Sequence, residues 1–126
     1  MDLDAIDHVV LTVRDIPASV TFYTRVLGMR EVLFGGNRRA LAFGHCKLNL
    51  HQAGREFEPK AAHPAPGAVD LCLLARTPVA EIVRHLAAHG VAIEDGPVER
   101  TGAQGPILSV YVRDPDGNLI ELSNPL

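Results

Sequence analysis

The chain of 126 residues is long enough for one domain with a hydrophobic core. Because 47% of its residues are apolar, the chain as a whole is not a disordered segment. Its formal net charge is −3 and no run of Lys or Arg stands out, which argues against nucleic acid or a membrane surface as the main partner. No apolar leader opens the chain and no segment reaches the length of a membrane span, so we expect a soluble, cytoplasmic protein.

The two cysteines, Cys46 and Cys72, lie in apolar runs that look like strands, and neither belongs to a C-x-x-C motif. Cysteines of this kind behave as small hydrophobic side chains in a reducing compartment. We therefore predict that both thiols are buried.

The first half of the chain predicts one helix and four strands. The β-branched run 6–13 favours a strand. Asp15 can cap a helix that has Pro17 in its first turn, and Gly28 is placed to end it. The other predicted strands cover residues 30–34, 40–43 and 46–51, with a tight turn at 35–37.

The second half begins with a linker. Residues 53–66 have no hydrophobic periodicity and contain three prolines. A strand is predicted over 68–75. Thr77 is predicted to cap the next helix, with Pro78 at its first position, and Gly90 is predicted to end it.

The C-terminal part predicts a strand, a loop and a hairpin. Residues 91–94 favour a strand, and the polar, Gly-containing stretch 96–105 favours a loop. The hairpin strands, 109–112 and 119–122, are joined by Asp114-Pro-Asp-Gly117, whose Pro and Gly are typical of a turn.

The two halves repeat the same order of elements. A shift of 62 residues places 6–11 on 68–73 and Gly28 on Gly90. An internal duplication is therefore expected, with one module at about 4–52, the linker at 53–66 and a second module at about 67–124 within a single domain 1–126.

Three polar residues each interrupt an apolar strand, namely His8, Asp70 and Glu121, and the first two are repeat mates. Imidazole and carboxylate groups are ligands for divalent metals. The repeat mate of Glu121 is Asn49 by apolar pattern, or His51 if the alignment slips by two. Each residue could instead face solvent, which is the commoner role of a polar strand residue. The other histidines are predicted to be on the surface: His45, His63, His85 and His89.

Several motifs resemble one known superfamily. Residues 6–8 (Ile-Asp-His), 22–28 (Phe-Tyr-Thr-Arg-Val-Leu-Gly) and 113–121 (Arg-Asp-Pro-Asp-Gly-Asn-Leu-Ile-Glu) are similar to the vicinal oxygen chelate superfamily of glyoxalases, bleomycin resistance proteins and dioxygenases. More narrowly, residues 47–52, 58–61 and 96–102 resemble the glyoxalase domain-containing protein 5 group.

This resemblance implies an α+β fold in which two paired βαβββ modules form a curved, open, eight-stranded barrel-like sheet around one divalent metal. It implies that His8, Asp70 and Glu121 bind the metal, with His51 or Asn49 as a fourth ligand. It also places substrate-binding residues at Ser109, Tyr111 and Arg113, the last of which belongs to the 113–121 motif.

Two departures from the superfamily pattern bear on function. Asp70 stands where a histidine is usual, so the donor set favours hard metals such as Mn²⁺, Fe²⁺ or Mg²⁺, with Ni²⁺ and Zn²⁺ as the other candidates. Glyoxalase I carries a glutamate in its fourth strand, where this chain has Asn49 or His51. We therefore do not expect true glyoxalase I activity.

The resemblance and the residues together predict a metal-dependent lyase, isomerase or transferase that acts on a small, oxygen-rich substrate. Glu121 would act at the metal, His51 as a fourth ligand or general base, and Tyr111 as a hydrogen-bond donor, while Asn49 would contact the substrate. The alternative is a metal-free protein that sequesters a small molecule. A thiol transferase is disfavoured, because Val10, two residues after His8, has an apolar side chain that could not bind a phosphonate. A homodimer is expected in each case.

Overall fold

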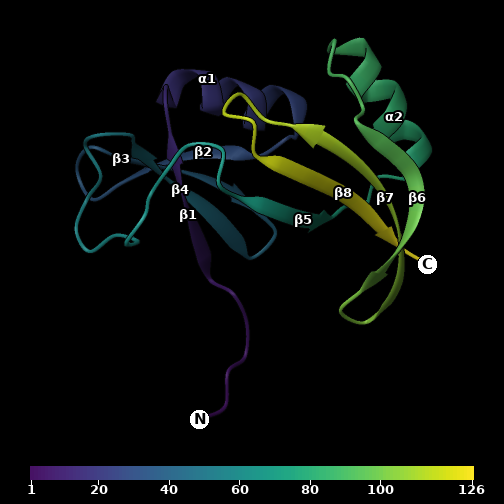
Figure 1. Ribbon diagram of the computed structural model, residues 1–126, viewed down its shortest axis with the longest axis horizontal. Coiled ribbons are helices and arrows are strands. Elements are labelled where there is room, and N and C mark those ends of the chain that lie inside the picture. Colours follow the sequence, from purple (N-terminus) through teal and green to yellow (C-terminus); the bar gives the residue numbers. More distant parts are fainter. The chain divides into compact units, whose positions relative to one another are not determined.

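Both halves of the chain fold in the same order, a strand, a helix and three further strands (Figure 1). The structure is a computed structural model that describes residues 1–126. Two compact units make up the chain, and we call Met1–Pro66 the first unit and Gly67–Leu126 the second unit.

The first unit contains a four-stranded mixed sheet in the order β1-β4-β3-β2, in which β1 and β4 are parallel. Leu11 and Leu48 are buried on the face that α1 covers, because alternate residues of a strand point to the same side. The elements are β1 (His8–Val13), α1 (Ile16–Thr21), a π-helix η1 (Phe22–Val26), β2 (Arg30–Phe34), β3 (Arg38–Phe43) and β4 (Cys46–Gln52).

The second unit repeats this topology, with a sheet in the order β5-β8-β7-β6 and a parallel pair β5 and β8. Its helix α2 packs Ile82 and Leu86 against one face of the sheet, where Val110 and Ile120 are also buried. The elements are β5 (Asp70–Leu74), α2 (Val79–Ala88), β6 (Asp95–Gly102), β7 (Gly105–Arg113) and β8 (Leu119–Pro125).

The predicted fold class is confirmed. Each unit is a βαβββ module, and the helices are few beside eight strands, so the chain is α+β. None of its helices has both the length and the apolar character that crossing a membrane requires.

Strand register decides between the two possible repeat mates of Glu121. Glu121 pairs with Cys72 in β5, and the shift of 62 residues places Cys72 on Val10. Val10 pairs with Asn49, so Asn49 occupies the position equivalent to Glu121. His51 lies two residues further along the same face of β4.

The sequence prediction was wrong between residues 91 and 105. Residues 91–94 form no strand, and the predicted loop 96–105 is largely β6 and the beginning of β7. Gly and Pro lower the strand propensity of this stretch. Pairing along β7 overrides that propensity, because each β6 residue from Val98 to Gly102 has a partner in β7.

The helix ends were predicted with mixed success. Asp15 caps α1 as predicted, and its carboxylate accepts a hydrogen bond from the Ala18 N–H at 3.2 Å. The first helix continues as η1, a π-helical segment that the sequence did not predict. Thr77 does not cap α2. The Asn124 side chain in β8 does so from outside, since its oxygen accepts from the Val79 N–H at 2.7 Å.

The two thiols are less buried than predicted. Cys46 is partly exposed and Cys72 is exposed. Cys72 occupies the sheet face opposite α2, together with Glu121, so its side chain does not enter the core beneath the helix. The four histidines that were predicted to be on the surface are all exposed: His45, His63, His85 and His89.

Candidate functional site

The first unit brings three of the predicted site residues to one face of its sheet. His8 pairs with Lys47, and Asn49 and His51 follow at alternate positions of β4, so all three candidates point away from the face that α1 covers. The strand pairing therefore accounts for their common orientation.

Asn49 and His51 are buried and incompletely bonded. They are only 7% and 3% exposed, and neither Asn49 Oδ1 nor His51 Nε2 has a hydrogen-bond partner. A buried polar atom without a partner costs about 1–3 kcal/mol, so such atoms are rare unless a ligand or ion satisfies them. These two atoms are therefore the best candidates in the first unit for contacts with a ligand or an ion.

The surroundings of His51 keep its ring neutral. Burial lowers the pKa of His51, the Arg38 guanidinium lowers it further, and Glu56 opposes both. The Phe57 ring meets the His51 ring edge-on at 5.5 Å, and Arg38 stacks on Phe57 at 4.4 Å. A neutral imidazole has a lone pair that can accept a proton or bind a metal.

We predict that His51 makes the chain less stable in acid. Its pKa in the folded chain lies below the ordinary value of 6.5, so the unfolded chain gains a proton first as the pH falls. Its contribution to the free energy of unfolding is complete above that value and is lost as the pH falls toward the lowered pKa. Urea unfolding from about pH 7.5 to about pH 5 in EDTA measures this slope.

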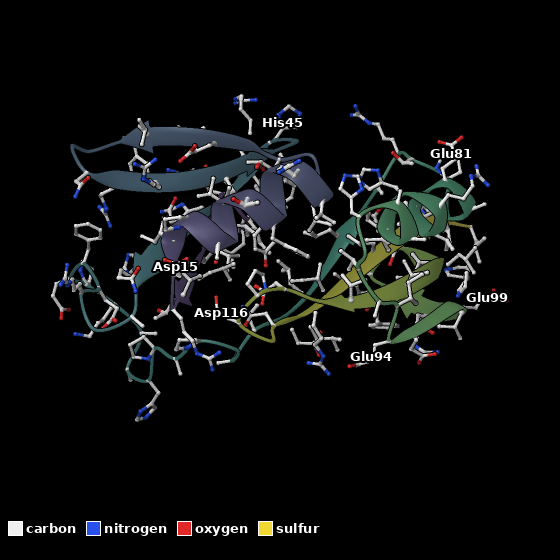
Figure 2. All side chains as sticks on the ribbon, turned by 90° about the horizontal axis from the view of Figure 1, so that it is seen from above. Asp15, His45, Glu81, Glu94, Glu99 and Asp116 are labelled. Atoms are coloured by element: carbon white, nitrogen blue, oxygen red, sulfur yellow. The ribbon has the colours of Figure 1, made fainter.

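His51→Gln should have a shallower slope than the wild type, while His45→Gln, which changes an exposed turn residue (Figure 2), should keep the wild-type slope. Equal slopes for the wild type and His51→Gln would contradict the assignment.

His8 is exposed, and its Nδ1 lies 2.8 Å from a carboxylate oxygen of Asp7. When that nitrogen donates to the carboxylate, Nε2 is left with its lone pair. A carboxylate in this role commonly orients a metal-binding histidine.

The second unit places Glu121 in the middle of three strands. Tyr111 in β7 and Cys72 in β5 are its direct neighbours. The Ser109 hydroxyl donates to Glu121 Oε2 at 2.6 Å and also lies 2.7 Å from the Ser123 hydroxyl. Ser109 is completely buried. It therefore holds the carboxylate of Glu121, and its contact with substrate stays a prediction.

Tyr111 has a hydrogen-bond partner that the sequence did not predict. Arg100 Nε donates to the Tyr111 hydroxyl at 3.0 Å. Burial raises the pKa of Tyr111, the bond from Arg100 opposes this, and Glu121 raises it further. Tyr111 is therefore a protonated donor at neutral pH. Arg100 was not among the predicted site residues because 96–105 was predicted as a loop, and a loop prediction does not say which side chains share a face.

These residues line a cavity of about 680 Å³ in the second unit. Its polar lining includes Cys72, Arg100, Tyr111 and Glu121, and the turn between β6 and β7 forms one side. Burial and the nearby carboxylates of Glu121 and Asp70 raise the pKa of the Cys72 thiol, although Ser123 opposes this. The thiol is therefore protonated at neutral pH and is a poor nucleophile.

Asp70 and Arg113 differ in their contacts with the rest of the second unit. Asp70 is exposed and opens β5 on the face that also carries Cys72. Arg113 donates to both carboxylate oxygens of Glu94, at 3.0 and 2.8 Å, and to the Gly117 carbonyl at 3.1 Å. These contacts tie β7 to the segment before β6, so Arg113 has a structural role here.

The candidate donors have the chemistry of a divalent metal site. Imidazole and carboxylate groups suit a divalent ion by their chemistry, and the unpaired His51 Nε2 is an available donor. His8 and His51 belong to the first unit, and Asp70 and Glu121 belong to the second unit. No group of three or more His, Cys, Asp or Glu side chains that could hold a metal ion is found in the structure.

Known proteins resemble this chain over nearly its whole length. A virulence protein of Salmonella typhimurium is 55% identical over 98% of this chain and 85% of its own. The crystal structure of that protein aligns with 100% of this chain and 100% of its own, with a TM-score of 0.99 and 54% identity. A glyoxalase domain-containing protein of Mycosarcoma maydis is 54% identical over 98% of this chain and 70% of its own.

Two structures less than 25% identical share the fold alone. One is an antibiotic-binding protein from a Streptomyces species, with a TM-score of 0.78 at 24% identity, covering 100% of this chain and 99% of its own. The other is a fosfomycin resistance protein of Listeria monocytogenes in complex with Mn(II), with a TM-score of 0.68 at 19% identity, covering 99% and 93%.

The sequence profile of the glyoxalase/bleomycin resistance protein/dioxygenase superfamily matches residues 5–122, which is most of the chain. The duplicated βαβββ topology agrees with that match. The chain therefore belongs to the glyoxalase/bleomycin resistance protein/dioxygenase superfamily.

Proposed function

We propose that this chain is a metal-dependent enzyme of glyoxalase type that acts on a small, oxygen-rich substrate. The observation that carries the proposal is the carboxylate of Glu121, which Ser109 orients at the wall of a cavity. A carboxylate held rigidly beside a cavity is suited to bind a metal or to move a proton.

In this proposal His8, Asp70 and Glu121 hold the metal, and His51 is a fourth ligand or a general base. A divalent metal at such donors polarises substrate oxygens and stabilises developing negative charge. With two carboxylates and one imidazole, the set favours Mn²⁺, Fe²⁺ or Mg²⁺ over Zn²⁺.

The side chains of this protein divide the remaining work. Ser109 keeps one oxygen of Glu121 engaged, which limits the rotation of the carboxylate. Tyr111 keeps its proton at neutral pH and can donate a hydrogen bond to a substrate oxygen. His51 is neutral there and can accept a proton.

We do not propose glyoxalase I activity. Strand register makes Asn49 the equivalent of Glu121, so this position offers an amide where glyoxalase I has a carboxylate. An amide neither binds a divalent metal strongly nor removes a proton, which leaves one of the two acidic groups of that reaction missing.

The metal content of the purified protein tests the proposal. We expect about one divalent metal per chain in protein prepared without chelator, and its loss in His8→Ala and Glu121→Gln. Elemental analysis on matched preparations measures this. Glu81→Gln is the matched control for Glu121→Gln, because Glu81 lies on the exposed side of α2 (Figure 2).

Adventitious binding needs a separate control. The exposed His85 and His89 rings lie 4.2 Å apart on α2, and two histidines at this spacing can bind stray metal. His89→Ala should therefore leave the tightly bound metal unchanged. Metal that persists in His8→Ala and Glu121→Gln, or no uptake from Mn²⁺, Ni²⁺ or Zn²⁺ by the wild type, would refute the proposed site.

A second candidate function is metal-free sequestration of a small molecule. It is favoured by the cavity, which has Leu74, Ile107 and Leu126 among its lining residues and suits an apolar ligand. Ligand binding that is unaffected by EDTA and produces no turnover would support this function over the enzyme.

A further inference from the structure

We infer that the cavity of the second unit binds a small carboxylic acid, whose carboxylate is held by Arg100. The inference names a substrate class for the proposed function and rests on that function for the reaction, but not for binding.

The charge of the cavity fits a single negative group. Among its lining side chains only Arg100 and Glu121 are charged, so Arg100 is the one side-chain cation that the cavity offers to a ligand. Phosphate and phosphonate groups carry more charge and commonly bind to clustered cations. A carboxylate has one charge and a planar shape that matches one guanidinium.

Arg100 has donors left for a ligand. A guanidinium has five N–H groups. Arg100 uses three of its groups, with the Tyr111 hydroxyl at 3.0 Å, the Glu99 carbonyl at 3.2 Å and Asp95 at 3.3 Å. The remaining two can donate to the oxygens of a carboxylate.

Asp95 competes with a ligand carboxylate for the positive charge of Arg100, but only weakly. Its carboxylate is 60% exposed and the Arg100 side chain is 42% exposed, so water screens their ion pair. A ligand carboxylate on the cavity side can share the guanidinium or displace Asp95. Removing the charge of Asp95 should therefore strengthen binding of an acid.

Tyr111 and Glu121, which line the same cavity as Arg100, indicate where a second oxygen-bearing group of the ligand would lie. Tyr111 lies directly opposite Glu121 in the strand register and accepts a hydrogen bond from Arg100. An acid bound at Arg100 would place a neighbouring hydroxyl or carbonyl toward Tyr111 and Glu121. Leu74 and Ile107 would cover its hydrocarbon part. A hydroxy acid with an apolar substituent meets all three requirements.

Mandelate is a suitable probe because it combines a carboxylate, an adjacent hydroxyl and an apolar ring. Mandelamide is its uncharged counterpart. By calorimetric titration of the full chain, we expect mandelate to bind about tenfold or more tightly than mandelamide. Arg100→Gln should weaken mandelate binding about tenfold to a hundredfold and should barely affect mandelamide.

Three further variants test the role of the charge. Arg100→Lys should retain part of the affinity, and Asp95→Asn should bind mandelate several-fold more tightly, a gain that loss of folding cannot produce. Arg84→Gln, which changes an exposed arginine of α2, should match the wild type. Circular dichroism confirms that each variant is folded.

The inference is overturned if mandelate does not bind, if mandelamide binds equally well, if Arg100→Gln binds mandelate like the wild type, or if phenylphosphonate is preferred. Repeating the titration with Mn²⁺ and with EDTA separates the two proposals. Mandelate binding by a chain that takes up no metal would refute the metal-dependent enzyme alone. Metal uptake without mandelate binding would refute the carboxylate site alone.

Discussion

Gly96→Ala is expected to lower the free energy of unfolding by about 3–5 kcal/mol, because both the backbone angle and the available space exclude a side chain there. Gly96 has a φ of +94°, which only glycine adopts readily. A Cβ atom would press against the carbonyl oxygen of Ser109 and lie 3.0 Å from the Val110 Cα. Both are backbone atoms of β7, so β6 would have to move away.

Gly90→Ala separates these two causes. Gly90 also has a positive φ, +68°, but nothing lies within 4 Å of an added Cβ. It should therefore cost only about 1 kcal/mol, from backbone strain alone. Chemical denaturation of both variants measures the difference. A Gly96→Ala variant no less stable than Gly90→Ala would show that β6 can move away from β7 at little cost.

Asp114→Ala is expected to lower the free energy of unfolding by about 3 kcal/mol, because it leaves several buried donors without a partner. Asp114 is 5% exposed. Its Oδ1 accepts from the Asp116 and Asn118 N–H groups, both at 2.9 Å, and its Oδ2 accepts from Asn118 Nδ2 at 2.8 Å.

The effect of Asp114→Ala should spread beyond the turn. Asn118 is oriented by Asp114, and its side-chain oxygen accepts from the Val69 N–H at 2.9 Å, just before β5. Loss of this bond loosens the start of the strand that carries Asp70. Hydrogen exchange of the Val69 amide should therefore accelerate together with the loss of stability.

Glu99→Ala is the control for Asp114→Ala, because Glu99 is an exposed acidic residue of β6 (Figure 2). Its change in stability should stay within about 0.5 kcal/mol. Asp114→Asn should fall between the two, since an amide keeps one acceptor oxygen but presents a donor to Asn118. If Asp114→Ala were as stable as Glu99→Ala, the turn network would be of no energetic importance.

Local rules were sufficient for much of the chain. The strand over 30–34 and the helix cap at Asp15 match the structure, because local residue patterns and capping side chains act over a few residues. The turn at Asp114–Gly117 also matches, with its closing hydrogen bond from the Gly117 N–H to the Asp114 carbonyl at 3.0 Å. The duplication was visible because both halves keep the same apolar spacing.

The same rules select candidate site residues but not their contacts. Polar residues that interrupt apolar strands pointed to His8, Asp70 and Glu121, which remain the proposed metal ligands. Ser109 was selected by its match to a substrate-side position, and the structure places it behind Glu121. A motif match identifies a position in the fold, but it does not say which neighbour a side chain contacts.

The sequence by itself determined the order of elements, the repeat and the faces on which polar residues interrupt the strands, because these depend on residues close together in the chain. Only the tertiary structure decided that Asn49 is the counterpart of Glu121, that Asn124 caps α2 and that β6 brings Arg100 to Tyr111. Each of these results depends on which strands pair and in what register, and pairing between distant segments overrides local propensity.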